Sequence, residues 1–131
     1  RGRQVLLVED DAVNRIVTTE LIRVITGLQV DSAEDGLQAV EMAAATAYDL
    51  ILMDMQLPGI DGLEATRRIH AFPHRQTVPV VALTANVLPD DVTRCVEAGM
   101  AGHLGKPVVA DELRLLFRKW FAKARVRRRA S

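Results

Sequence analysis

The sequence predicts an α/β fold in which a doubly wound, parallel five-stranded sheet carries helices on both faces. Short apolar runs alternate five times with segments of helical periodicity, which is typical of βαβ units. The middle runs are apolar throughout, as expected for strands that are covered on both sides. With 131 residues, of which 49% are hydrophobic and 26% charged, the chain suits one globular domain with a substantial core.

Five strands are expected at the apolar runs. The run at residues 4–8 has four apolar residues after a polar one, and the run at residues 50–53 is apolar throughout. Residues 28–30 form a short, weak run, which predicts an edge strand. Pro79 lies near the start of its run, where a missing backbone donor is tolerated. The remaining strands are predicted at residues 78–83 and 101–105.

Five helical segments lie between and after these runs. The segment at residues 89–99 has proline and two acids in its first turn and glycine at its end. The other later helices are predicted at residues 35–45, 62–69 and 111–121. In the first helix, apolar residues recur at helical spacing and a glycine stops it: Val13, Ile16, Val17, Leu21, Val24, Ile25 and then Gly27.

Charge is spread unevenly along a chain whose formal net charge is zero. Residues 1–110 hold 9 basic and 15 acidic side chains, whereas residues 111–131 hold 8 basic and 2 acidic ones. The basic tail at residues 124–131, which follows a domain of residues 1–123, could contact nucleic acid or anionic lipid. Because it has no interleaved aromatic residues, we expect it instead to be a solvated helix end or linker stub. We expect no nucleic acid or membrane contact through this domain.

Cysteine content and hydropathy indicate the compartment. The single cysteine, Cys95, excludes an internal disulfide and a cysteine-rich zinc site, and it suits a reducing environment. No apolar run approaches the ~18 residues of a membrane span, and no signal peptide precedes the first strand. A cytoplasmic location is expected, which includes the cytoplasmic part of a membrane-bound protein. The chain starts at Arg1 instead of methionine, which suggests a piece of a longer protein.

Polar residues follow the predicted strands where each strand ends. Glu9 and Asp10 come directly after the first strand, and Asp54 ends the third. Thr84 follows the fourth strand and Lys106 the fifth. Ligands of open parallel sheets bind outside the carboxyl ends of the strands, so these residues are expected to converge there.

Three carboxylates in one small area need a cation. Two unit charges ~5 Å apart repel by about 3 kcal/mol at an effective dielectric constant of about 20. Oxygen ligands without cysteine or histidine favour Mg²⁺ or Mn²⁺ over Ca²⁺. Lys106 and Thr84 beside a metal-bound carboxylate indicate an arriving phosphoryl group, whose oxygens they would neutralise while Asp54 attacks phosphorus.

Four segments resemble a known family. VEDD, LMDMQLPGIDG, LTA and KP, in that order and spacing, resemble the receiver domains of two-component response regulators, from about residue 5 to residue 121. EDDAVNRIV, MDMQLPGIDGLEATRRI and CVEAGMAGHLGKPV are similar to receivers attached to hybrid sensor histidine kinases. The resemblance implies a flavodoxin-like strand order, 2-1-3-4-5. A receiver of a stand-alone response regulator or transcription factor is the alternative.

The resemblance implies a phosphoacceptor and a metal site. Asp54 would take a phosphoryl group from a phosphohistidine and form an acyl phosphate. Glu9, Asp10 and Asp54 would hold Mg²⁺ together with the backbone carbonyl of Gln56. Glu9 replaces the aspartate seen in many members. The donor would be a histidine kinase domain in the same parent chain or a histidine phosphotransfer protein.

The resemblance also implies a conformational switch. Thr84, the Ala85 amide and Lys106 would bind phosphoryl oxygens, and Thr84 would turn inward with residue 103 following. That movement would alter the face made by the fourth helix, fifth strand and fifth helix, which a partner reads and which could also form a homodimer. His103 stands where the family usually has tyrosine or phenylalanine, which predicts a weaker or pH-dependent switch.

The lifetime of the acyl phosphate and the catalytic character of the domain follow from the same resemblance. Gln56 and Asn86 lie two residues past Asp54 and Thr84, where the family tunes that lifetime. The isolated domain would assist its own phosphorylation and slow hydrolysis without turning over a separate substrate. The parent chain would be the histidine kinase.

Other classes remain open on the residues alone. An aspartate-nucleophile phosphohydrolase also uses Asp, Thr, Lys and Mg²⁺, but it carries a second aspartate two residues after its nucleophile, where this chain has Gln56. A flavin carrier would need a phosphate loop after the first strand, where the sequence EDDAVN would repel phosphate. A receiver that binds a partner without phosphorylation would not need all five site positions filled.

Overall fold

Five parallel strands form a single sheet in the order β2-β1-β3-β4-β5. A computed structural model describes residues 3–85 and 89–130, with side chains placed as far as residue 121. The predicted fold class and strand order are confirmed. The strands are β1 (Gln4–Val8), β2 (Gln29–Ala33), β3 (Leu50–Asp54), β4 (Val80–Thr84) and β5 (Gly102–Gly105).

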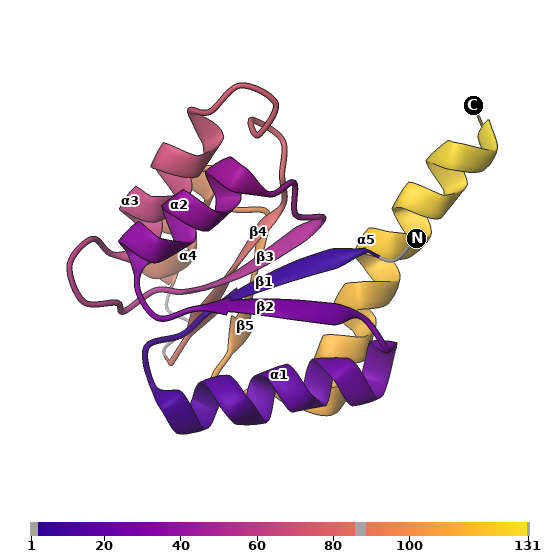
Figure 1. The fold of residues 1–131 in the computed structure, drawn as a ribbon, viewed down its shortest axis with the longest axis horizontal. Coiled ribbons are helices and arrows are strands. Elements are labelled where there is room, and N and C mark those ends of the chain that lie inside the picture. Colours follow the sequence, from indigo (N-terminus) through magenta and orange to yellow (C-terminus); the bar gives the residue numbers. More distant parts are fainter. Residues whose placement is uncertain (1–2, 86–88, 131) are drawn as a thin grey trace.

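Helices cover both faces of the sheet. In Figure 1, α2, α3 and α4 lie on one side and α1 and α5 on the other. This arrangement gives two separate apolar layers, one centred on Leu6, Ile51 and Ile69 and the other on Leu7, Ile22 and Leu113. The helices are α1 (Ala12–Thr26), α2 (Gly36–Ala45), α3 (Gly62–His70), α4 (Pro89–Glu97) and α5 (Ala110–Ala130).

The three central strands are buried because each has a neighbour on both edges and helices on both faces. The apolar residues of β1, β3 and β4 are at most 1% exposed and follow one another along each strand instead of alternating with polar residues. The edge strand β2 has exposed or half-buried positions before Ala33. The predicted edge strand is therefore confirmed, although it begins at Gln29 and ends three residues later than the sequence pattern indicated.

Aspartates fix where three helices begin. Asp11, Asp35 and Asp61 each precede a helix and accept a hydrogen bond from the backbone N–H three residues later. At the other end of α1, Gly27 has φ 71°, a left-handed conformation that glycine adopts without steric cost. These caps set the exact points at which the chain turns from strand to helix.

The outward face of α1 is unusually apolar. Ile22 and Thr18 are buried against the sheet, and Leu21 and Ile25 are partly buried. The remaining apolar residues of the predicted periodic set point to solvent and are 59–75% exposed: Val13, Ile16, Val17 and Val24. The periodicity thus identified the helix correctly, but most of its apolar positions lie on the exposed side.

The last helix is longer than predicted. It continues from Ala110 to Ala130, past the expected end at residue 121 and through the proposed boundary at residues 123 and 124. The N-terminal strand lies beside it (Figure 1), and the Arg3 guanidinium stacks over the Phe121 ring at 4.9 Å. None of the helices in the described part of the chain is long and apolar enough to cross a membrane.

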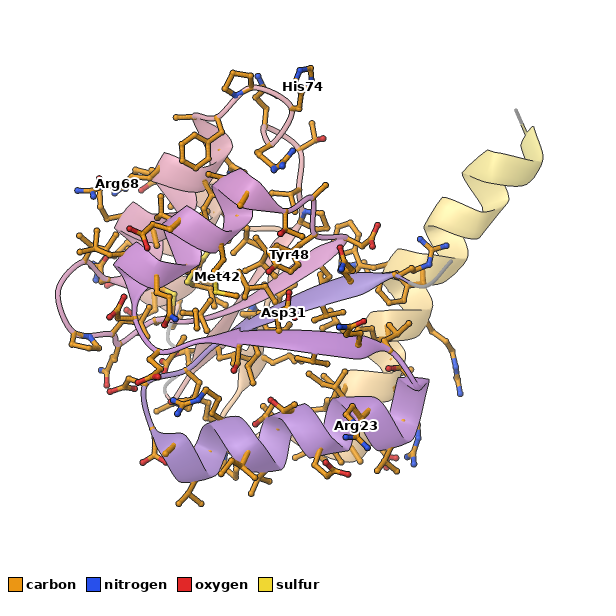
Figure 2. All side chains as sticks on the ribbon, in the orientation of Figure 1. Arg23, Asp31, Met42, Tyr48, Arg68 and His74 are labelled. Carbon is orange, nitrogen blue, oxygen red and sulfur yellow. The ribbon has the colours of Figure 1, made fainter. Side chains whose placement is uncertain are left out.

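A polar contact ties the chain before β3 to the edge strand. The Tyr48 hydroxyl donates to an Asp31 carboxylate oxygen at 2.7 Å, and the two side chains lie near each other in Figure 2. Burial, followed by the hydrogen bond and charge of Asp31, raises the pKa of Tyr48 to about 12. The hydroxyl therefore stays protonated and remains a donor to β2 throughout the physiological range.

Candidate functional site

The strand register places two carboxylates side by side at one edge of the sheet. Val8 pairs with Met53 in the parallel β1–β3 ladder, so the next residues along the two strands, Glu9 and Asp54, are neighbours. Both lie in a buried setting, with only 2% and 3% of their surface exposed. Burial of two adjacent acids is costly unless other groups compensate for their charge.

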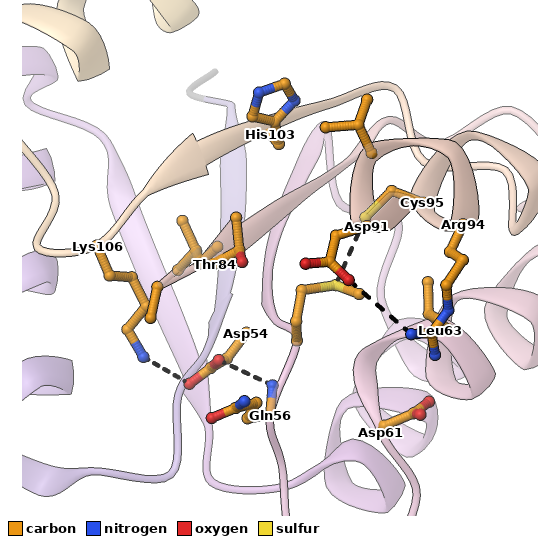
Figure 3. Close-up of a pocket in the computed structure, with 14 residues that line it drawn as sticks. Asp54, Gln56, Asp61, Leu63, Thr84, Asp91, Arg94, Cys95, His103 and Lys106 are labelled. Carbon is orange, nitrogen blue, oxygen red and sulfur yellow. Dashed lines mark hydrogen bonds and ion pairs between the residues drawn. The ribbon is translucent and has the colours of Figure 1, made fainter. Parts of the chain in front are cut away.

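Lys106 compensates both carboxylates. Its ammonium lies 2.9 Å from Asp54 Oδ2 and 3.2 Å from Glu9 Oε1. Figure 3 shows the Asp54 carboxylate between this ammonium and the backbone amide of Gln56, which donates to Asp54 Oδ1 at 3.1 Å. Both oxygens of Asp54 are therefore held in place. The Lys106–Pro107 peptide that follows is cis.

The proton affinities of Glu9 and Lys106 reflect this crowding. Burial, followed by the hydrogen bond with Asp54, raises the pKa of Glu9 above the ordinary glutamate value, against the lowering effect of the Asp11 amide and Lys106. Burial alone would lower the pKa of Lys106, but the hydrogen bond and charge of Asp54, followed by those of Glu9, raise it overall. Lys106 is thus firmly cationic, and Glu9 retains more proton affinity than an isolated glutamate.

The acidic residues suit a divalent cation. Glu9, Asp10 and Asp54 each offer a carboxylate oxygen, and these oxygens lie within 4.8 Å of one another. Asp10 is exposed at the rim, so an ion can enter from solvent, while Glu9 and Asp54 form the buried wall. Hard oxygen donors in this arrangement fit Mg²⁺ or Mn²⁺.

A cavity of about 250 Å³ adjoins the acidic residues on the side of α4. Thr84, Ala85 and Lys106 line it together with Asp54, so the four predicted phosphoryl-contacting positions border one space. Asp91, Arg94 and Cys95 of α4 form the opposite wall (Figure 3). Burial, and then the charge of Asp91, raises the pKa of Cys95, so this thiol is held protonated.

The predicted site residues are brought together to different degrees. Glu9, Asp10, Asp54 and Lys106 converge, and Thr84 and Ala85 border the same cavity. His103 lines the far wall of the cavity, is exposed, and points away from Asp54 in Figure 3. Asn86 lies outside the described residues, so its predicted role stays a prediction. The Gln56 carbonyl likewise stays a predicted metal ligand.

Two features of the site were absent from the sequence interpretation. The Arg15 guanidinium reaches back from α1 to the backbone carbonyls of Glu9 and Asp10. The sequence feature that could have indicated this contact is the position of Arg15, four residues after the N-cap Asp11. A long side chain at that position can fold back onto the residues before the helix. The second feature is Gly62, where a Cβ would lie 2.5 Å from the Asp54 carbonyl oxygen.

Comparison with known proteins identifies the family. The sequence model of the response regulator receiver domain matches residues 5–118. Two-component system protein A of Emericella nidulans is 38% identical over 121 residues, which cover 91% of this chain and 17% of that protein. Two-component response regulator ORR41 of Oryza sativa subsp. japonica is 41% identical over 120 residues, which cover 89% of this chain and 93% of that protein.

Solved structures agree with this relationship. The magnesium-bound receiver domain of the sensor histidine kinase PA1611 from Pseudomonas aeruginosa has a TM-score of 0.85 and 43% identity over 93% of this chain and 99% of that one. The receiver of Ssk1 from Saccharomyces cerevisiae, solved with the histidine phosphotransfer protein Ypd1, has a TM-score of 0.83 and 29% identity over 91% and 88%.

A parallel 2-1-3-4-5 sheet with helices on both faces, with clustered acids and a lysine at its carboxyl edge, defines a flavodoxin-like α/β domain. The chain belongs to the response regulator receiver domain family. It corresponds to nearly the whole of the rice relative but to about a sixth of the fungal one, at 17% of its length.

Close packing at Gly62 predicts a strict requirement for glycine there. Gly62→Ala should lower the free energy of unfolding by about 1–3 kcal/mol, because the new Cβ would overlap the Asp54 carbonyl and force β3 and α3 apart. Urea denaturation followed by circular dichroism measures the change. Gly102→Ala is the matched control, since a Cβ there meets nothing within 4 Å. Equal stability of the two variants would contradict the packing argument.

Proposed function

We propose that this chain is the phosphoryl-accepting receiver of a two-component phosphorelay, with Asp54 as the acceptor. The observation that carries the proposal is the contact of one ammonium, that of Lys106, with both buried carboxylates, Asp54 and Glu9. An ion pair that only stabilised the fold would need one acid. Here Lys106 contacts two buried acids, and a third, exposed acid and a cavity lie beside them. These groups supply a nucleophile, metal ligands, a cation for the phosphoryl oxygens and space for the phosphoryl group.

The transfer follows from the positions of the side chains. An Asp54 carboxylate oxygen attacks phosphorus, the P–N bond to the donor imidazole breaks, and its electron pair remains on the imidazole nitrogen. The Lys106 ammonium, already 2.9 Å from Oδ2, neutralises a phosphoryl oxygen, while the Thr84 hydroxyl and the Ala85 amide bind the others. The product is an acyl phosphate on Asp54.

The metal site belongs to the same proposal. Glu9, Asp10 and Asp54, with the Gln56 carbonyl, would hold Mg²⁺, with Mn²⁺ as the substitute. When bound, the ion supplies positive charge that offsets the charge developing on the phosphoryl oxygens. The magnesium-bound PA1611 receiver, 43% identical to this chain, supports the choice of ion.

The parent protein and its partners are proposals as well. The donor is a histidine kinase domain or a histidine phosphotransfer protein, as supported by the PA1611 and Ssk1–Ypd1 structures. We infer a hybrid sensor kinase as the parent, with this domain in the cytoplasm at residues 1–123 and a basic tail or linker at residues 124–131. The output surface is formed by α4, β5 and α5, next to His103, and it is also the candidate homodimer face.

A docking surface for the donor lies on α1. A groove of about 360 Å³ runs from Glu9 and Lys106 to Val17 and Leu21. It connects the acidic rim with the exposed side chain of Val17, and the exposed Ile16 precedes Val17 in the same helix. A histidine that reaches Asp54 must come from a partner covering this rim, and exposed apolar side chains beside it supply a contact area to be buried.

Removal of the acceptor tests the central claim. Incubation with Mg²⁺ and a small phosphodonor such as acetyl phosphate should add one phosphoryl group to the wild type and none to Asp54→Asn. The amide lacks the nucleophilic carboxylate but keeps the shape of the site. Intact-protein mass spectrometry measures the added mass. Labelling of Asp54→Asn would place the acceptor elsewhere.

Magnesium should stabilise the folded chain. We expect millimolar Mg²⁺ to raise the melting temperature of the wild type and not that of Asp10→Asn, because the ion relieves repulsion among the carboxylates. A raised Glu9 pKa means that the metal-free fold loses stability as pH rises through that pKa. The rise in melting temperature caused by Mg²⁺ should therefore grow as the pH is raised above the ordinary glutamate pKa and through the raised pKa of Glu9. If Mg²⁺ raised the melting temperature by the same amount at every pH, this result would argue against Glu9 as a ligand.

The docking surface can be separated from the chemistry. Ile16→Glu should reduce phosphorylation by a phosphorylated histidine phosphotransfer domain at least about tenfold, because a buried charge at the centre of an interface is costly, while labelling by acetyl phosphate stays unchanged. Leu37→Glu, on α2 across the sheet, is the matched control, since Leu37 is also an exposed apolar residue. Equal loss with both donors would mean that Ile16 acts on the site itself.

A further inference from the structure

One guanidinium holds the turn that carries two of the three acids. Arg15 Nη1 donates to the Glu9 carbonyl at 2.9 Å and lies 3.4 Å from the Asp10 carbonyl. The first carbonyl belongs to the peptide before Asp10 and the second to the peptide after it. A single side chain therefore anchors both peptide planes that flank the Asp10 Cα, and these planes set the direction in which its carboxylate leaves the backbone.

Asp10 is the acid that most needs such support. Glu9 is buried and held by the Asp11 amide at 3.2 Å and by Lys106, and Asp54 is buried and held by Lys106 and the Gln56 amide. Asp10 is exposed and lies in the turn between β1 and α1. Side-chain packing constrains it least, so its orientation depends on the backbone.

The stability of α1 does not account for the position of Arg15. The helix already has its N-cap, since Asp11 accepts a hydrogen bond from the Asn14 amide at 2.9 Å. A cation in the first turns of a helix is disfavoured by the helix dipole, whose positive end lies there. The guanidinium therefore occupies an unfavourable place for the helix, and the two carbonyls of the acidic turn compensate for it.

We propose that Arg15 is the positioning residue for Asp10: its two carbonyl contacts fix the acidic turn so that the Asp10 carboxylate faces Asp54 and Glu9. This inference rests on the proposed metal site. Arg15 acts through the backbone and touches neither the ion nor the phosphoryl group.

The charge of Arg15 and its proposed positioning role predict opposite effects of its removal on Mg²⁺ affinity. A cation beside a site for a divalent ion repels that ion, so loss of Arg15 would tighten Mg²⁺ binding if its charge were all that mattered. If Arg15 positions Asp10, its loss should weaken binding, as is usual when groups that orient metal ligands are removed. The sign of the change in affinity decides between these roles.

Isothermal titration of the 131-residue chain with MgCl₂ tests the proposal. We expect Arg15→Met to raise the Mg²⁺ dissociation constant about tenfold. Arg15→Lys keeps the charge, but its ammonium lies one bond closer to the helix backbone than Arg15 Nη1, which makes both carbonyl contacts, so a smaller loss is expected. Arg23→Met is the matched control because Arg23 lies on the same helix, is exposed, and faces only Glu20 at 3.7 Å among the described ion pairs.

Melting curves in EDTA verify that each variant is folded before titration. Unchanged or tighter Mg²⁺ binding by Arg15→Met would overturn the proposal, and wild-type binding by Arg15→Lys would overturn the requirement for the longer reach of the guanidinium. If Arg15→Met does not fold, Arg15→Lys alone decides. Absence of Mg²⁺ binding by the wild type would instead refute the proposed metal site, so the two failures are distinguishable.

Discussion

The pairing of Lys106 with two buried carboxylates is the interaction on which the site depends. Glu9 and Asp54 are both almost fully buried, and their neighbouring positions are imposed by the β1–β3 register. Without a cation, ionisation of both would be costly enough to favour protonation of one. The ammonium, at 2.9 and 3.2 Å, compensates for the charge of both carboxylates inside the fold, which under the proposed function leaves Asp54 available as the nucleophile.

Under the proposed function, the balance of charge around Asp54 explains why the site would bind a divalent cation and then a phosphoryl group. When ionised, Glu9, Asp10 and Asp54 carry three negative charges, and Lys106 and Arg15 carry two positive ones. The residual charge is negative by one, which attracts a divalent cation, and the cation in turn leaves the rim positive. A phosphoryl group then restores the balance. Each ligand prepares the site electrostatically for the next.

The sequence was sufficient to predict the strands and the residues at their carboxyl ends, because both follow from the positions of the short apolar runs. The apolar run in each central strand ends at the carboxyl edge of the sheet. The first polar residue after each run, Glu9, Asp54 or Thr84, was therefore placed correctly at that edge. Arg15 was missed because its contacts are to backbone carbonyls, which leave no trace in residue types. The exposed face of α1 was missed because periodicity does not say which side of a helix meets the sheet.

The surroundings of Asp54 differ on the two sides of the sheet. This difference determines which helix a change at Asp54 would displace. On the side of α1 and α5, the groove of about 360 Å³ reaches Glu9 and Lys106 but is not lined by Asp54 or Thr84, and Leu7, Ile22 and Leu113 are fully buried in the layer against the sheet. On the other side, a cavity separates Asp54 and Thr84 from Cys95 and Arg94 of α4. Closely packed layers transmit strain as rigid units, whereas a cavity allows its walls to rearrange. Under the proposed function, a new charge on Asp54 would therefore displace α4 more readily than α1. The donor and the output partner would then use different faces, so the docking surface on α1 could persist while the output face changes.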